Sequence, residues 1–242
     1  MEAQPIITND LSISGSGSAD GGRYRNARIN GNGRIDGDLE CRSFKSAGHS
    51  HVYGNLAAGE VILRGSGSVA GNVRSELLSV SGNGEFRGDV AAGLVKVNGS
   101  AGIGGSLTAD TAVIRGSVQI NGDCEAEKFE AYGGFEVGGL LNAGMIDIRL
   151  FGPCRAREIG GESIRVNKNG FLNSLASLFG SKRISLEAGT IEGDVIYLEH
   201  TFASVVRGRD VKIGPGCEIG RVEYTNTLYV DMQSTVAERQ QL

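Results

Sequence analysis

Histidine and cysteine are the residue types in this sequence that could most readily support catalysis or metal binding. The chain of 242 residues contains 3 histidines and 4 cysteines. His49 and His51 share one face of a short extended segment, but no third metal ligand is evident nearby in the sequence. We therefore expect both to be solvated turn residues and not a metal pair. The four cysteines form no CxxC pair, and we expect them to be reduced core residues; they are Cys41, Cys124, Cys154 and Cys217.

Acidic, amide and glycine-rich positions could in principle bind calcium or phosphate. One column of turn residues contains Asp38, Asn55, Asn72, Asp89 and Asp123, and it is interrupted by Ser106. The segments GNGRIDG (31–37) and GSGSVAG (65–71) resemble nucleotide-binding loops, but equivalents recur along the chain and no Walker-type loop is present. Both features are better explained by turn chemistry. The sequence therefore predicts no catalytic, cofactor-binding or metal site.

Two columns of glycine define a repeat of 17 residues. The first column comprises Gly31, Gly48, Gly65, Gly82, Gly99, Gly116 and Gly133, and the second comprises Gly37, Gly54, Gly71, Gly88, Gly105, Gly122 and Gly139. Because glycine is disfavoured inside helices, a helical repeat would not keep two glycines in every copy. We expect these glycines at turns, with positive φ or with close approach between backbones.

Apolar residues recur in register with the glycines. In the copy that starts at Gly82, Val90 and Ala92 are two residues apart, as are Val95 and Val97. This spacing is typical of strands with one buried face. Short strands joined by glycine-bearing turns predict an all-β fold, a single-stranded parallel β-helix with about 17 residues per coil.

The repeat pattern also predicts the organisation of the chain. We expect a flexible N-terminus (1–10), a main β-helix (11–166), a helical insert (167–183), a continuing or second short β-helix (184–230) and a flexible tail (231–242). In the insert, an apolar stripe is typical of a short amphipathic helix and comprises Phe171, Leu172, Leu175, Leu178 and Phe179. This helix would either pack on the flank of the β-helix or contact a membrane surface or a partner.

Charge and hydropathy exclude several classes of protein. With 24 basic and 28 acidic residues, the chain lacks the electrostatic character of a nucleic-acid-binding protein. No apolar run has the length of a membrane span, and MEAQPIITND lacks the features of a signal peptide. We therefore expect a soluble, cytoplasmic protein.

The ends of a β-helix expose unpaired strand edges and an open apolar core. No capping helix is apparent before Leu11 or after Val230, so we expect each end to bind another copy of the chain. An outward apolar strip could support lateral bundling or membrane contact, and it comprises Ile62, Leu77, Leu94, Val113 and Met145.

Repeats such as GNGEFRGDV and GDVAAGLVKVNG resemble those of the bactofilins, the polymer-forming cytoskeletal proteins of bacteria. The run VVRGRDVKIGPGCEIGRVEY (205–224) is similar to longer bactofilin-type proteins of Gram-positive bacteria. The resemblance covers residues 11 to 230 and implies a right-handed parallel β-helix that polymerises end to end without nucleotide. It further implies a scaffold, often at the inner face of the membrane, that supports cell shape, motility or the positioning of client proteins.

The sequence departs from many bactofilins in two respects. The chain is longer and is divided by the insert at 167–183, and MEAQPIITND lacks the short hydrophobic membrane motif of many family members. Membrane contact would then depend on Phe171–Phe179. Two alternatives remain open: a β-helical enzyme acting on carbohydrates or acyl groups, and a monomeric adaptor. His200 could suggest the catalytic histidine of β-helical acyltransferases, but the hexapeptide rhythm of those enzymes is missing.

Overall fold

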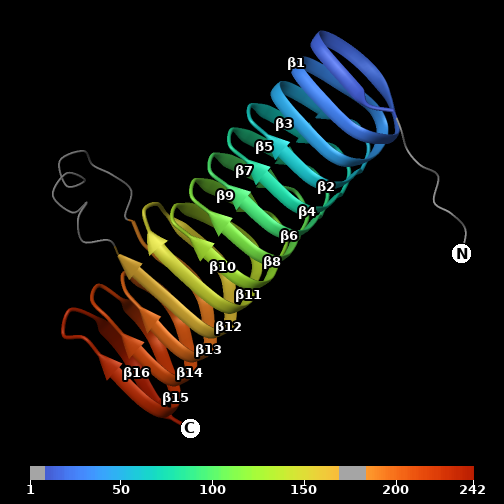
Figure 1. Cartoon of the computed structure of the whole chain (residues 1–242). Coiled ribbons are helices and arrows are strands. Elements are labelled where there is room, and N and C mark those ends of the chain that lie inside the picture. Colours follow the sequence, from blue (N-terminus) through green and yellow to red (C-terminus); the bar gives the residue numbers. More distant parts are fainter. Residues whose placement is uncertain (1–8, 169–183) are drawn as a thin grey trace, which may run out of the picture. The chain divides into compact units, whose positions relative to one another are not determined.

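The computed structural model describes residues 9–168 and 184–242, which form strands and turns. These residues divide into two compact units, Met1–Ala109 and Asp110–Leu242. Within the first unit, strands pair in parallel to form successive coils (Figure 1). Its strands are β1 (Leu11–Val52), β2 (Leu56–Leu63), β3 (Ser66–Val69), β4 (Val73–Val80), β5 (Asn83–Phe86), β6 (Val90–Val97) and β7 (Ser100–Ile103).

The second unit has the same construction, and its strands from β11 to β15 are 13 to 17 residues long. Strand β8 (Leu107–Ile114) begins before the boundary of the unit and ends inside it. The other strands are β9 (Ser117–Ile120), β10 (Cys124–Ala131), β11 (Gly134–Leu150), β12 (Cys154–Lys168), β13 (Leu186–Leu198), β14 (Thr201–Ile213), β15 (Glu218–Val230) and β16 (Thr235–Gln241). Consecutive strands from β11 to β16 pair in parallel. The predicted parallel β-solenoid is confirmed.

The core consists of apolar columns that run from coil to coil. Leu56 lies opposite Val73, which in turn lies opposite Val90, and each is 1% exposed. Phe44, Phe86 and Phe129 are among the largest side chains that are fully buried. Because paired residues are 17 apart in these coils, equivalent side chains stack directly on one another. The four cysteines are also buried, as the sequence predicts.

The glycine columns are explained mainly by close packing between coils. Gly48 has a φ of 121°, but Gly88 lies outside the region of positive φ. A Cβ atom at Gly88 would overlap Oδ1 of Asn72 and lie 2.9 Å from the carbonyl carbon of Gly71. The prediction of positive φ or close backbone approach is confirmed: Gly48 shows positive φ, and Gly88 shows the close approach.

The aspartate and asparagine column forms a ladder of hydrogen bonds beside these glycines. Oδ1 of Asn55 accepts a hydrogen bond from the backbone N–H of Asn72, and Oδ1 of Asn72 accepts one from Asp89, both at 2.9 Å. Each side-chain oxygen thus accepts a hydrogen bond from the backbone N–H of the equivalent residue in the next coil. The absence of a side chain at the neighbouring glycine provides the space for this oxygen.

The solenoid continues on both sides of residues 169–183. Cys154 of β12 lies opposite Leu186 of β13, so these strands are direct neighbours in the second unit. The division between the two compact units lies after Ala109. Whereas the sequence predicts a flexible tail after residue 230, Thr235–Gln241 form β16, because their backbone groups pair with Glu218–Tyr224 of β15.

Replacing Gly88 with valine is expected to lower the free energy of unfolding by about 1–3 kcal/mol, the usual cost of overpacking. The new side chain would displace the Asn72 amide from its bond with the N–H of Asp89. Urea unfolding, followed by circular dichroism, measures the loss.

A double-mutant cycle with Asn72→Ala separates this cause from general glycine effects. If Asn72 is the obstacle, the cost of Gly88→Val is smaller in the Asn72→Ala background. Equal costs in both backgrounds would contradict the explanation.

Candidate functional site

The apolar segment predicted to contact a membrane or partner lies outside the described residues. It comprises Phe171, Leu172, Leu175, Leu178 and Phe179. Its helical structure and its contacts therefore stay predictions. Within the described ranges, no helical segment has the length and apolar character that a membrane crossing needs.

The predicted lateral strip comprises residues of different exposure. Leu77 and Leu94 lie opposite each other on β4 and β6 and are half-buried. Ile62 lies in the adjacent column, opposite Ser79. In the second unit, Val113 is only 8% exposed, whereas Met145 is 50% exposed. The structure thus brings Leu77 and Leu94 together as a small apolar surface, and their role in contacts stays a prediction.

The buried cysteines have the environment of inert core thiols. Burial raises the pKa of the Cys41 thiol to about 11 and those of Cys124 and Cys154 to about 12. A thiol with such a pKa holds its proton at neutral pH and is a poor nucleophile or metal ligand. These cysteines therefore serve packing.

The histidines lie in two different environments. His49 and His51 lie on strand β1, so the expectation that they are turn residues is wrong. His51 shares a short hydrogen bond, through Nδ1, with Oγ of Ser68. His200 has a φ of 46° and its backbone N–H donates to the carbonyl of Pro215 at 2.9 Å. Burial lowers the pKa of both His51 and His200.

A β-helical enzyme would need several acidic or histidine side chains that converge on one point. Across residues 9–168 and 184–242, no group of three or more His, Cys, Asp or Glu residues could hold a metal ion. The ring of His200 lies close to Gly216, where a Cβ atom would be 2.6 Å from Nδ1. His200 is therefore packed at a turn, against Gly216.

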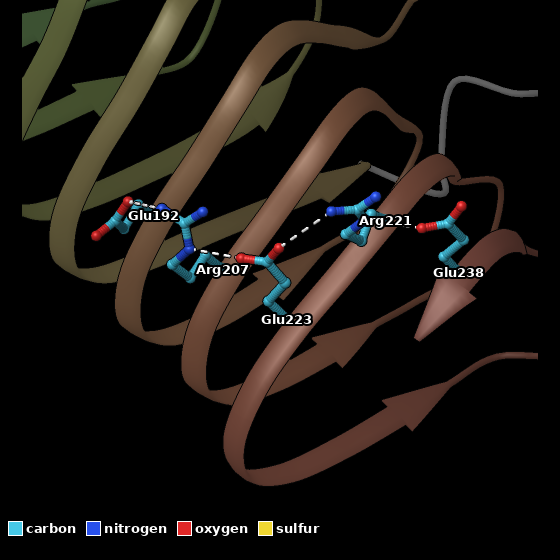
Figure 2. A network of polar contacts seen from close by, with 5 residues as sticks. All are labelled: Glu192, Arg207, Arg221, Glu223 and Glu238. Carbon is cyan, nitrogen blue, oxygen red and sulfur yellow. Dashed lines mark hydrogen bonds and ion pairs between the residues drawn. The ribbon is translucent and has the colours of Figure 1, made fainter. Parts of the chain in front are cut away.

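A ladder of alternating charges joins the last four strands of the second unit (Figure 2). Arg207 on β14 contacts Glu192 on β13 at 3.0 Å and Glu223 on β15 at 2.7 Å. Arg221 on β15 contacts Glu223 at 3.6 Å and Glu238 on β16 at 2.8 Å. Glu223 is the most enclosed member, with 9% of its surface exposed. The ladder thus ties successive coils together on their outer face.

Sequence inspection missed this ladder because its members are 15 to 17 residues apart and the spacing varies. The sequence feature that could have indicated the ladder is the recurrence of Glu and Arg at intervals close to the length of one coil. Recognising it required the register of β13 to β16, which shifts between Gly208 and Asp210.

A second column in this unit combines aromatic rings with a lysine. Nζ of Lys212 lies 5.2 Å from the ring centre of Tyr197 and 5.5 Å from that of Tyr229. Both distances fit cation–π contacts. A hydrogen bond with Glu199, together with burial, raises the pKa of Tyr197 to about 12. The column ends at Tyr229, which is 54% exposed.

The core is open at the last coil described. Leu228 and Val230 continue the inward columns of Val211 and Ile213. Val211 and Ile213 are 2% and 0% exposed, whereas Leu228 and Val230 are only half-buried. Among the described residues, β16 covers β15 only along Glu218–Tyr224. Leu228–Val230 thus present a strand edge and apolar side chains to their surroundings.

These features define a repeat protein of the parallel β-solenoid class. Its distinctive surfaces are the strand edge at Leu228–Val230 and the columns of charged and aromatic side chains on the outer face. Comparison with known proteins gives the family. The chain belongs to the bactofilin family, which is described as polymer-forming cytoskeletal and matches residues 4–91. The identification made from the repeat and the C-terminal run is confirmed. The family's description is that of a structural, cytoskeletal family.

Two proteins of Bacillus subtilis are similar to the chain. YhbE, described as uncharacterized, is 57% identical over 232 residues, which cover 95% of this chain and 97% of YhbE. YhbF, also described as uncharacterized, is 43% identical over 104 residues, which cover 43% of this chain and 42% of YhbF. No solved structure matches the chain.

The ladder predicts a specific loss of stability in acid. The hydrogen bond from Arg207, assisted by Arg221, lowers the pKa of Glu223 below its value in the unfolded chain. Its contribution is therefore complete above the unfolded pKa and is lost as the pH falls through the folded pKa. Glu223→Gln is expected to reduce stability at neutral pH and to weaken its decline in acid.

Thermal unfolding between pH 7 and pH 3 measures this effect. Glu158→Gln removes an exposed carboxylate outside the ladder and is the matched control. If both variants follow the same pH profile as the unmodified chain, the ladder contributes nothing to acid sensitivity.

Proposed function

We propose that this bactofilin is a non-enzymatic, self-assembling cytoskeletal scaffold that polymerises end to end without nucleotide. The observation that carries the proposal is the open core at Leu228 and Val230, beside an uncovered strand edge. An exposed edge of this kind is a template for pairing with another chain. Pairing with a second copy would continue the backbone ladder and bury the two apolar side chains.

Polymerisation of this kind requires no bound nucleotide. The driving forces are burial of apolar area and the pairing of strand edges, both of which are available in a folded chain. The glycine-rich segments do not need a phosphate to explain them. A Cβ atom at Gly65 or Gly82 would overlap the carbonyl oxygen of the glycine one coil earlier, so both serve coil packing.

We also propose that the polymer acts in the cytoplasm, at the inner face of the membrane. Membrane contact would come from the apolar segment Phe171–Phe179, which Lys168, Lys182 and Arg183 flank. A short apolar stripe with basic flanks suits binding at a lipid surface. One segment would bind weakly, but a polymer multiplies the sites and raises the avidity.

The expected role of such a polymer is to support cell shape, motility or the positioning of client proteins. A polymer of identical chains would repeat the outer columns of each copy at regular intervals. A scaffold with repeated surfaces can bind several clients in fixed order.

Purified protein without nucleotide is expected to form filaments in negative-stain electron microscopy. The double variant Leu228→Glu and Val230→Glu places charge at the open core and should abolish filaments. Circular dichroism checks that it remains folded, and the single variant Val230→Lys provides a milder change at the same edge.

The matched control is the double variant Ile62→Glu and Leu94→Glu, which changes outer apolar residues of the first unit. It should still form filaments, with less lateral bundling if the strip mediates side-by-side contact. If the Leu228→Glu, Val230→Glu double variant and the Val230→Lys variant both form filaments like the unmodified chain, assembly through Leu228 and Val230 is refuted. A monomer at high concentration would contradict the whole proposal.

Liposome flotation tests the membrane contact independently. The double variant Leu175→Glu and Leu178→Glu should lose binding to anionic vesicles and keep its filaments, because assembly and membrane contact are expected to use different residues. Equal flotation of the variant and the unmodified chain, with both folded, would exclude Phe171–Phe179 as the membrane contact.

A further inference from the structure

Two histidines stand side by side on the outer face of β1. His49 and His51 alternate with Ser50, which is 7% exposed and points inward. Since side chains alternate along a strand, both imidazoles project from the same face. His49 is exposed and His51 is partly exposed, so both can be reached from solvent. Their backbone positions are about 6.6 Å apart, from the rise of a strand.

The ring of His51 is held in place by two neighbours. Its Nδ1 is hydrogen-bonded to Oγ of Ser68, which lies opposite His51 on β3. Its ring centre is 4.0 Å from that of Tyr53. A bond at Nδ1 leaves Nε2 available as a ligand. This arrangement is typical of metal-binding histidines, whose second nitrogen is usually oriented by a hydrogen bond.

The surroundings of the pair have room and polar groups for a hydrated ion. The histidines line a shallow pocket of about 420 Å³, together with Asn32, Ser66 and Glu85. Two arginines, Arg87 and Arg34, place positive charge near His51. Arg34 lines the pocket and is paired with Asp36 at 2.9 Å. The carboxylate of Glu85 adds a negative charge at the margin of the pocket. A cation bound here would therefore rely on the imidazole ligands and on Glu85 to outweigh the charges of Arg34 and Arg87.

In contrast to the expectation from the sequence, we propose that His49 and His51 form a two-imidazole site for a borderline transition-metal cation such as Zn²⁺. Imidazole nitrogen is a preferred ligand of Zn²⁺, Cu²⁺ and Ni²⁺. Two ligands leave coordination positions open, and water or the same histidine pair of a second copy can fill them. The site is independent of the core opening at Leu228 and Val230.

Equilibrium dialysis of the full chain against Zn²⁺ tests the proposal. The protein carries no histidine tag and is first stripped with a chelator, so that the 3 native histidines are the only ones present. We expect saturable binding, and each of His49→Ala and His51→Ala should weaken it at least tenfold. The control is His200→Asn, because asparagine tolerates the positive φ at that position. It should bind Zn²⁺ like the unmodified chain.

A change at Ser68 tests the orientation of His51. Ser68→Ala should weaken binding about tenfold, in the range known for groups that orient metal ligands. Ser68→Thr should restore binding, because it keeps the hydroxyl group.

The stoichiometry identifies what completes the site. One Zn²⁺ per chain supports completion by water, and one per two chains, with Zn²⁺-dependent association in sedimentation, supports completion by a second copy. Binding that is unchanged in the double variant His49→Ala and His51→Ala, or lost only in His200→Asn, would overturn the proposal.

Discussion

Backbone pairing between successive coils is the constraint on which the rest of this structure depends. Each coil must place its N–H groups opposite the carbonyl groups of its neighbour, and in the regular coils this holds the offset at 17 residues. Once that offset is set, every side chain lies above its equivalent in the preceding coil. Apolar columns, polar ladders and exposed columns all follow from this single register.

The glycine and aspartate–asparagine columns satisfy this constraint together at one corner. An amide such as that of Asn72 caps the first N–H of the following coil, and Gly88 leaves the space that the amide needs. Both columns are needed. A side chain in place of the glycine would push neighbouring coils apart. Without the amide, a backbone N–H group would lose its hydrogen bond. The same corner therefore explains two sequence features that otherwise resemble binding motifs.

The second unit uses other side chains for the same purpose. Between β13 and β16, Arg207 and Arg221 connect coils through Glu223, and Lys212 lies between two tyrosine rings. In this part of the second unit, side chains on the outer face thus supply contacts between coils. The core itself has no such closure at Leu228 and Val230, which is why the proposed assembly involves this edge.

The sequence alone determined the architecture, because glycine and apolar residues at a fixed interval allow only a stacked coil. It also predicted the buried cysteines and the family, since both depend on columns that the repeat makes visible. Tertiary structure decided the rest. The strand at Thr235–Gln241 and the ladder through Glu223 depend on which backbone groups meet across irregular spacings. The sequence shows that His49 and His51 share one face, but the contact of His51 with Ser68 one coil later depends on the register of the folded chain.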